Sequence, residues 1–256
     1  MKVCELLLCK LMRVVTATLA VIILFSWAPS LAAQIRVACV GDSITYGVAV
    51  SSPSTTYPAD LQASLGSGYN VQNFGYPGLA LMNLPQGNPS SHPAYTTTTQ
   101  YTSMVAFNPN IIIVMLGTND ASFPVDGAGW SSDYLATFTT QYEAFITTLR
   151  ALPAKPIVFV ATLPTVFGTN QYGIDPTVAN TIITPALHSI ASASNAPLID
   201  VHTATANLGS DFADNVHPND AGTAAIATAA FNALQPNIAP CTAGLRVQRP
   251  LSETRS

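Results

Sequence analysis

Gln34-Ile35-Arg36-Val37-Ala38-Cys39-Val40-Gly41-Asp42-Ser43 is the stretch that decides the fold of this 256-residue chain. Its run from Ile35 to Val40 is largely apolar and β-branched, which is typical of a strand buried on both faces of a parallel sheet. Gly41 permits the chain to turn directly after this strand. Ser43 therefore lies at the carboxyl end of a strand, where open α/β sheets bind their ligands.

Four further apolar runs follow along the chain, and we expect each to form a strand: Tyr69–Phe74, Ile111–Leu116, Ile157–Ala161 and Pro197–Val201. The stretches around them have helical patterns, at Tyr57–Leu65, Tyr95–Phe107, Asp133–Leu149, Pro176–Ser194 and Pro218–Leu234. This alternation predicts one α/β domain in which a five-stranded parallel sheet lies between two layers of helices.

Two long irregular segments, Pro77–Ala94 and Ala121–Ser132, each follow a strand. Because ligands bind beyond the carboxyl ends of the strands, we expect these segments to form walls of a binding site. Simple surface loops are the alternative. The role of the second segment stays open at this point.

The N-terminus has the order of a secretory signal peptide. Basic residues precede an apolar run from Val14 to Trp27, and small residues follow up to Ala33. The run is shorter than the ~20 residues of a membrane-spanning helix, so cleavage is favoured over a retained anchor. Residues 1–33 are thus predicted as a signal peptide, whose true start is Met1 or Met12. We expect a secreted or periplasmic protein, without stable membrane insertion after cleavage, a domain over 34–238 and a loose tail over 239–256.

The charge of the remaining chain is strongly acidic. Residues 34–240 contain three basic side chains against eleven acidic ones, a net charge of −8. Such a surface does not neutralise a phosphate backbone, so nucleic acid is excluded as a partner, and an anionic membrane surface fits equally badly. A small-molecule or carbohydrate substrate without charge fits better. The oligomeric state is left open.

Two cysteines remain after cleavage, Cys39 in the first strand and Cys241 in the tail. Two cysteines do not make a disulfide framework, and a buried thiol at Cys39 is favoured over a bridge between the two. The spacing of cysteines and histidines matches no metal site, so we expect no bound metal.

A serine needs a base to become a nucleophile. The candidates are His92, His188, His202 and His217. His217 follows Asp214 by three residues, so that the carboxylate can reach back to the imidazole and orient it. The rival is His202, with Asp200 two residues before it on the fifth expected strand. Spacing favours His217, and a role for His92 stays open.

Two other motifs follow strands. Gly117-Thr118-Asn119-Asp120 places a side-chain amide where it can stabilise an oxyanion, and the alternative is a simple turn. Asn73-Phe74-Gly75-Tyr76-Pro77-Gly78 offers a glycine N–H for the same purpose, and the alternative is a Pro-Gly turn.

Taken in order, the four segments resemble the sequence blocks of the SGNH hydrolases, also called the GDSL esterase/lipase family. The matching segments are Gly41-Asp42-Ser43, Asn73 to Gly78, Gly117 to Asp120, and Asp214 to Pro218. The resemblance spans about 37–235. Ile44 stands where the family's name has Leu, as in many members. A Gly-x-Ser-x-Gly elbow is absent from the sequence, which argues against the ordinary α/β-hydrolase fold.

The resemblance implies a flavodoxin-like strand order 2-1-3-4-5, no cofactor, and catalysis by Ser43, His217 and Asp214. It also implies an oxyanion hole made by the N–H groups of Ser43 and Gly78 and the amide of Asn119, with Gly75 as the fallback for Gly78. We further expect O-acetyl esters on carbohydrate as substrates, since parts of the chain look like the carbohydrate acetylesterase-like branch. A lipase or thioesterase for longer acyl chains, and a non-catalytic carbohydrate-binding protein, are the alternatives.

Overall fold

The computed structural model describes residues 33–85, 87–88, 91–123, 130 and 132–238. The predicted signal peptide, apart from Ala33, and the predicted tail from residue 239 lie outside these residues, and both stay predictions. Within the described part of the chain, no helix is long and apolar enough to cross a membrane.

Five parallel strands form one sheet in the order β2-β1-β3-β4-β5. The strands are β1 (Ile35–Gly41), β2 (Tyr69–Gly75), β3 (Ile111–Met115), β4 (Ile157–Ala161) and β5 (Leu198–Ile199). This is the sheet expected from the sequence, and the order confirms the predicted fold class. Because all strands are parallel, their carboxyl ends share one edge of the sheet.

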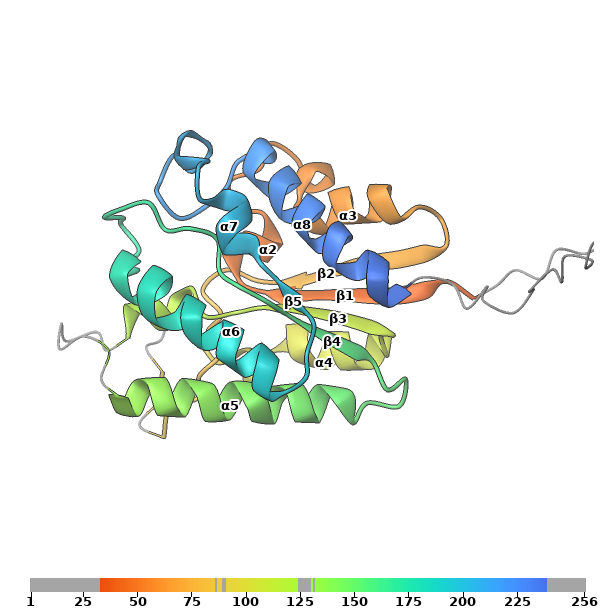
Figure 1. The fold of residues 1–256 in the computed structure, drawn as a ribbon, viewed down its shortest axis with the longest axis horizontal. Coiled ribbons are helices and arrows are strands. Elements are labelled where there is room, and N and C mark those ends of the chain that lie inside the picture. The colour runs from red at the N-terminus through yellow and green to blue at the C-terminus, as the bar shows by residue number, and fades with distance from the viewer. Residues whose placement is uncertain (1–32, 86, 89–90, 124–129, 131, 239–256) are drawn as a thin grey trace, which may run out of the picture. The chain divides into compact units, whose positions relative to one another are not determined.

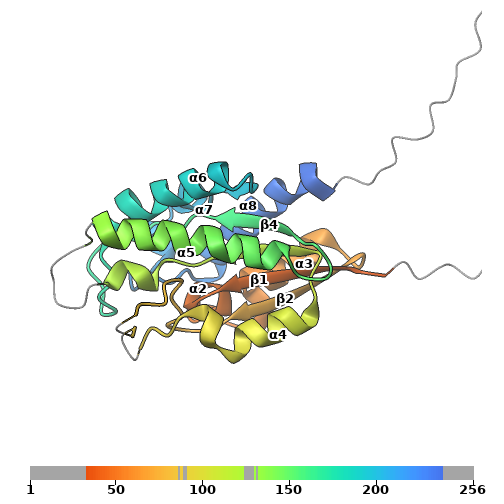
Figure 2. The ribbon, with the colours of Figure 1, turned by 90° about the horizontal axis from the view of Figure 1, so that it is seen from below.

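Helices cover both faces of the sheet (Figure 1). One face carries α3 (Tyr57–Leu65) and α8 (Asp220–Ile238), and the other carries α4 (Thr99–Phe107), α5 (Ser132–Arg150) and α6 (Thr184–Ala193). Figure 2 views this second face, with α5 between α4 and α6. Successive residues of β1 enter opposite cores, since Val37 and Cys39 pack toward α3 and α8 while Ala38 and Val40 pack toward the other layer. Cys39 is a fully buried free thiol, and Cys241 lies outside the described residues.

Two expected elements differ in the structure. The fifth strand ends at Ile199 because Asp200 caps the short helix α7 (Val201–Thr205), where its Oδ1 accepts the N–H of Thr203 at 3.0 Å. Asp200 and His202 therefore do not alternate along a strand. The helix expected over Pro176–Ser194 contains a π-helical segment, η4 (Val178–Ile183), directly before α6.

Candidate active site

Ser43 is the first residue of a four-residue helix, α2 (Ser43–Tyr46), directly after β1. Asp42 caps this helix, since its Oδ1 accepts the N–H of Ile44 at 2.9 Å. The helix packs so closely on the sheet that a Cβ at Gly75 would lie 2.5 Å from the backbone nitrogen of Tyr46. A Cβ at Gly41 would lie 2.9 Å from the carbonyl oxygen of Met115. The two glycines thus allow α2 to hold Ser43 at the carboxyl edge of the sheet.

His217 and Asp214 come from the loop directly before α8. His217 Nε2 lies 2.8 Å from Ser43 Oγ, and its Nδ1 lies 2.7 Å from Asp214 Oδ2. The other carboxylate oxygen, Oδ1, accepts the backbone N–H groups of Val216 and His217 at 2.9 and 2.7 Å. Burial raises the pKa of Asp214, but the hydrogen bonds from His217 and Val216 outweigh it and lower this pKa to about 2. The carboxylate is therefore ionised wherever His217 can act as a base.

Tyr172 is a fourth member of this cluster that sequence reasoning did not single out. Its hydroxyl donates to Asp214 Oδ2 at 3.0 Å, and its ring meets the His217 ring edge-on with the centroids 4.8 Å apart. Tyr172 lies in the loop after β4, which carries no motif. The tertiary fold, and not a sequence motif, brings this loop next to His217.

A cavity of about 370 Å³ opens at Ser43 and His217, and Gly78 and Asn119 line its other side. Gly78 has a left-handed φ of +81°, and a Cβ there would lie 2.4 Å from the carbonyl oxygen of Ser91. Asn119 is almost fully buried, and its Nδ2 donates to the carbonyl of Leu79 at 2.9 Å. Gly75, the fallback for Gly78, lies outside this cavity and against α2 instead.

Two buried carboxylates support the two sides of the cavity. Asp120 accepts the N–H groups of Leu81 and Met82, both at 2.8 Å, and so holds the segment that follows Gly78. Asp42, which is fully buried, directly precedes Ser43 and caps α2. Burial raises the pKa of each carboxyl to about 6, against the hydrogen bonds that each accepts. Both carboxylates stand in segments that the sequence analysis selected, Asp42 beside Ser43 and Asp120 beside Asn119. Their supporting roles depend on loop contacts that residue spacing does not predict.

Of the other three histidines, one lines the cavity and two do not. His92 lines the cavity, and its Nδ1 lies 3.1 Å from the carbonyl oxygen of Gly78. His202 lies away from Ser43, with its Nδ1 3.5 Å from Thr165 Oγ1. His188 is exposed on α6. The expected base thus faces Ser43, and the rival does not.

The walls of the cavity match the expected loops in part. Pro77–Ala94 contributes Pro77, Gly78, Ser91 and His92. The described residues of Ala121–Ser132 do not line the cavity, although Phe123 packs against the His92 ring with centroids 6.0 Å apart. The loop after β4 supplies the other wall, through Gln171, Tyr172 and Ile174. Within the described ranges, no group of three or more His, Cys, Asp or Glu side chains is placed to hold a metal ion.

Residues 39–225 match the family described as GDSL-like lipase/acylhydrolase. The chain belongs to this family. The match covers all four motifs and every strand of the sheet from the middle of β1 onward, so the resemblance seen in the sequence is confirmed. Membership places this GDSL-like domain among the carboxylic ester hydrolases.

Relatives of this GDSL-like domain include an acetylxylan esterase of Xylanibacter ruminicola, 30% identical over 220 residues, which are 77% of this chain and 43% of the relative. A multidomain esterase of Ruminococcus flavefaciens is 28% identical over 222 residues, which are 75% of this chain and 27% of that protein. The chain thus spans less than half the length of these curated relatives. A solved carbohydrate acetylesterase family member from Sinorhizobium meliloti shares the fold, with a TM-score of 0.62 at 18% identity, over 79% of this chain and 98% of that one.

Proposed function

We propose that this domain is a serine esterase that hydrolyses short acyl esters, with O-acetyl groups on carbohydrate as the substrate class. The observation that carries the proposal is the hydrogen-bonded series from Ser43 Oγ through the His217 ring to Asp214, with distances of 2.8 and 2.7 Å. A serine, an imidazole and an ionised carboxylate in this order are the parts that nucleophilic acyl transfer requires.

In the proposed reaction, Ser43 Oγ attacks the ester carbonyl carbon while His217 Nε2 takes the hydroxyl proton. The tetrahedral intermediate then collapses, and the protonated His217 gives that proton to the leaving alcohol. Water attacks the acyl-enzyme by the same route, with His217 taking its proton and returning it to Ser43. Asp214 orients the imidazole and stabilises its positive charge in each half of the reaction.

The oxyanion of the intermediate would be bound by the N–H groups of Ser43 and Gly78 and by the amide of Asn119. An amide nitrogen carries two hydrogens, and the Asn119 amide uses one of them for the carbonyl of Leu79. The second is left for the oxyanion, in an orientation that the first bond holds in place. Loss of one such donor typically lowers turnover about 10²–10³-fold.

Three observations support acetylated carbohydrate as the substrate. The relatives named above include an acetylxylan esterase, and the body of the chain is poor in basic residues, which suits a neutral ligand. The cavity of about 370 Å³ is near the lower end of small-molecule sites, which fits a short acyl group with part of a sugar. A lipase or thioesterase for longer chains is the second candidate.

The test is hydrolysis of 4-nitrophenyl esters from acetate to decanoate by the wild-type protein and by Ser43→Ala. We expect the highest kcat/KM on acetate and a loss of about 10⁴-fold or more in the variant. Ser64→Ala, on the exposed surface of α3, is the matched control and should keep full activity. A preference for octanoate or longer would favour the lipase alternative. Equal hydrolysis by Ser43→Ala and wild type would contradict the mechanism, and sugar binding without hydrolysis would favour a binding protein.

We also propose that the protein is secreted or periplasmic, on the basis of the basic, apolar and small-residue order at its N-terminus. The test is N-terminal sequencing of the protein recovered outside the cytoplasm. A mature chain that begins near residue 33 or 34 supports the proposal. A full-length chain that stays in the cytoplasm contradicts it.

A further inference from the structure

Large apolar side chains on the surface gather around the catalytic cavity. The described part of the chain has six that are well exposed, and four of them, Tyr46, Val48, Tyr76 and Tyr172, lie at the carboxyl edge of the sheet. The other two, Ile35 and Ile157, begin strands at the opposite edge. Clusters of exposed apolar side chains mark binding surfaces. The binding surface at this edge of the sheet therefore extends beyond the cavity itself.

Tyr46 and Tyr76 form one corner of this edge. Their rings are half exposed, at 51% and 49%, and meet nearly at right angles with centroids 6.1 Å apart. Tyr46 ends α2, and Tyr76 directly follows β2. A tyrosine offers an apolar ring face together with a hydroxyl that stays in water. Such a corner fits a ligand with both apolar C–H faces and hydroxyl groups, and a pyranose ring has both.

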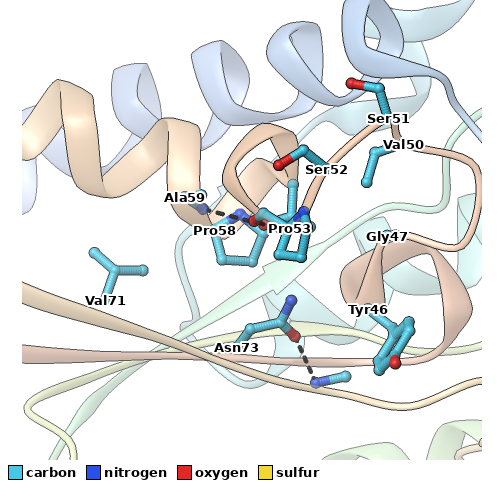
Figure 3. Close-up of a pocket in the computed structure, with 12 residues that line it drawn as sticks. Tyr46, Gly47, Val50, Ser51, Ser52, Pro53, Pro58, Ala59, Val71 and Asn73 are labelled. Carbon is cyan, nitrogen blue, oxygen red and sulfur yellow. Dashed lines mark hydrogen bonds between the residues drawn. The ribbon is translucent and has the colours of Figure 1, made fainter.

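A second hollow, of about 500 Å³, begins beside Tyr46. Figure 3 shows Tyr46 at one end, Val71 at the other and Asn73 between them, with Pro53 and Pro58 opposite. None of the described residues that line this hollow is charged. An uncharged hollow again favours a neutral ligand.

One turn of backbone separates this hollow from the catalytic cavity. The N–H groups of Gly47 and Val48 both donate to the carbonyl of Ser43, at 2.9 and 3.1 Å. Tyr46 and Gly47 line the hollow, while Ser43 and Val48 line the cavity. One helical turn rises about 5.4 Å, comparable to the length of one sugar residue. The hollow and the catalytic cavity are therefore lined by residues of one short segment, 43–48, so that a sugar beside the esterified one is placed next to the hollow.

We propose that Tyr46, Tyr76 and the adjoining hollow form a subsite for a neighbouring sugar residue, so that the domain acts on esterified oligosaccharides in preference to monosaccharides. The inference rests on the proposed function, because it places the ester at Ser43. It adds a specificity site outside the catalytic cavity.

The experiment compares kcat/KM on 4-nitrophenyl acetate, acetylated xylose and acetylated xylohexaose. The wild type should prefer the hexaose. Tyr46→Ala and Tyr76→Ala should each remove about tenfold from kcat/KM on the hexaose, chiefly through KM, because each loses one stacking face. Both variants should match the wild type on 4-nitrophenyl acetate. Ala59→Arg, which fills the hollow from α3, should act like them, whereas Ile157→Ala, an exposed truncation at the opposite edge, should change nothing.

The subsite is contradicted if the wild type cleaves acetylated xylose and the hexaose equally well, or if the tyrosine variants keep the preference. A binding measurement separates this failure from failure of the esterase proposal. Unacetylated xylohexaose is titrated into Ser43→Ala and into Ser43→Ala with Tyr76→Ala, and Kd should rise about tenfold in the double variant. An unchanged Kd would overturn the subsite even where the esterase activity is established.

Discussion

The oxygen Oδ2 of Asp214 serves two donors at once, the imidazole of His217 and the hydroxyl of Tyr172. Two donors on one oxygen compete for its negative charge, so the tyrosine weakens the hold of the carboxylate on the imidazole. The edge-on ring of Tyr172 also limits how far the imidazole can swing. At this scale, one residue outside the sequence motifs contacts both the carboxylate of Asp214 and the ring of His217.

Tyr172→Phe tests this balance, because it removes the hydroxyl and keeps the ring. Asp214 then attracts the proton on the imidazole more strongly, and the acid limb of the kcat/KM profile should move to higher pH, by less than about one unit. kcat at the plateau should change little. Tyr172→Ala removes the wall as well and should raise KM. An acid limb that stays in place in the Phe variant would show that the hydroxyl has no electrostatic role.

Tyr172 also shows which kind of site residue the sequence does not predict. Ser43, Gly78, Asn119, Asp214 and His217 each stand in a motif beside a strand end or a helix start, and the structure brings them to one cavity. The loop after β4 has no such pattern. Its path depends on packing against residues more than 40 positions further along the chain, as the contact from Tyr172 to Asp214 shows.

At the scale of elements, the close approach of α2 to the sheet decides where Ser43, the proposed nucleophile, lies. A Cβ at Gly75 would lie 2.5 Å from the backbone nitrogen of Tyr46 in α2 and 2.9 Å from the backbone oxygen of Asp42, the residue that caps α2. Neither backbone atom can move without shifting the helix.

Gly75→Ala should therefore lower both stability and activity. We expect a loss of about 1–3 kcal/mol in the free energy of unfolding and a fall of roughly 10²-fold in kcat, since a displacement of about 1 Å at a reacting group has this effect. Urea unfolding and 4-nitrophenyl acetate hydrolysis measure the two. Gly68→Ala is the control, because a Cβ at Gly68 meets nothing within 4 Å. Equal behaviour of the two variants would mean that α2 is not held by this contact.

Elements with a strong pattern were predicted closely, and those decided by single side chains were not. The four longer strands match because their apolar runs fill both cores. The fifth strand is cut to two residues by the cap at Asp200, whose effect outweighs the strand propensity of Val201. The role of Ala121–Ser132 stays open: its described residues do not line the cavity, although Asn119 at the start of η3 (Asn119–Ser122) does.

At the scale of the whole molecule, the buried carboxyls make stability depend on pH. Burial raises the pKa of Asp42 to about 6, although the hydrogen bond from the N–H of Ile44 acts in the opposite direction. An unfolded Asp has a pKa near 3.9, so between about pH 4 and 6 the folded chain binds this proton more tightly than the unfolded chain. The contribution to stability is full below pH 4 and is lost as pH rises through 6, by up to about 3 kcal/mol.

Asp42→Asn keeps the acceptor for Ile44 and cannot ionise. We expect the drop in unfolding free energy from pH 4 to pH 7 to be smaller in this variant than in the wild type, as measured by urea unfolding at both values. Asp214→Asn is the control. The pKa of Asp214 is lowered to about 2, so its stabilising effect is present above about pH 4 and lost below it, outside the tested range. If the unfolding free energy of Asp42→Asn falls between pH 4 and pH 7 by as much as that of the wild type, Asp42 is excluded as the source of the fall.

The contact between Ser43 and His217 joins residues 174 positions apart, one in the short helix after the first strand and one in the loop before the last helix. Contacts of such long range form late in folding, because the entropy of closing the loop opposes them until the rest of the chain has packed. In partly folded chains, the side chains of Ser43 and His217 are therefore not yet in contact. Turnover of a chromogenic ester is in this way an assay of complete folding, and its recovery after dilution from denaturant should lag behind the return of helical structure.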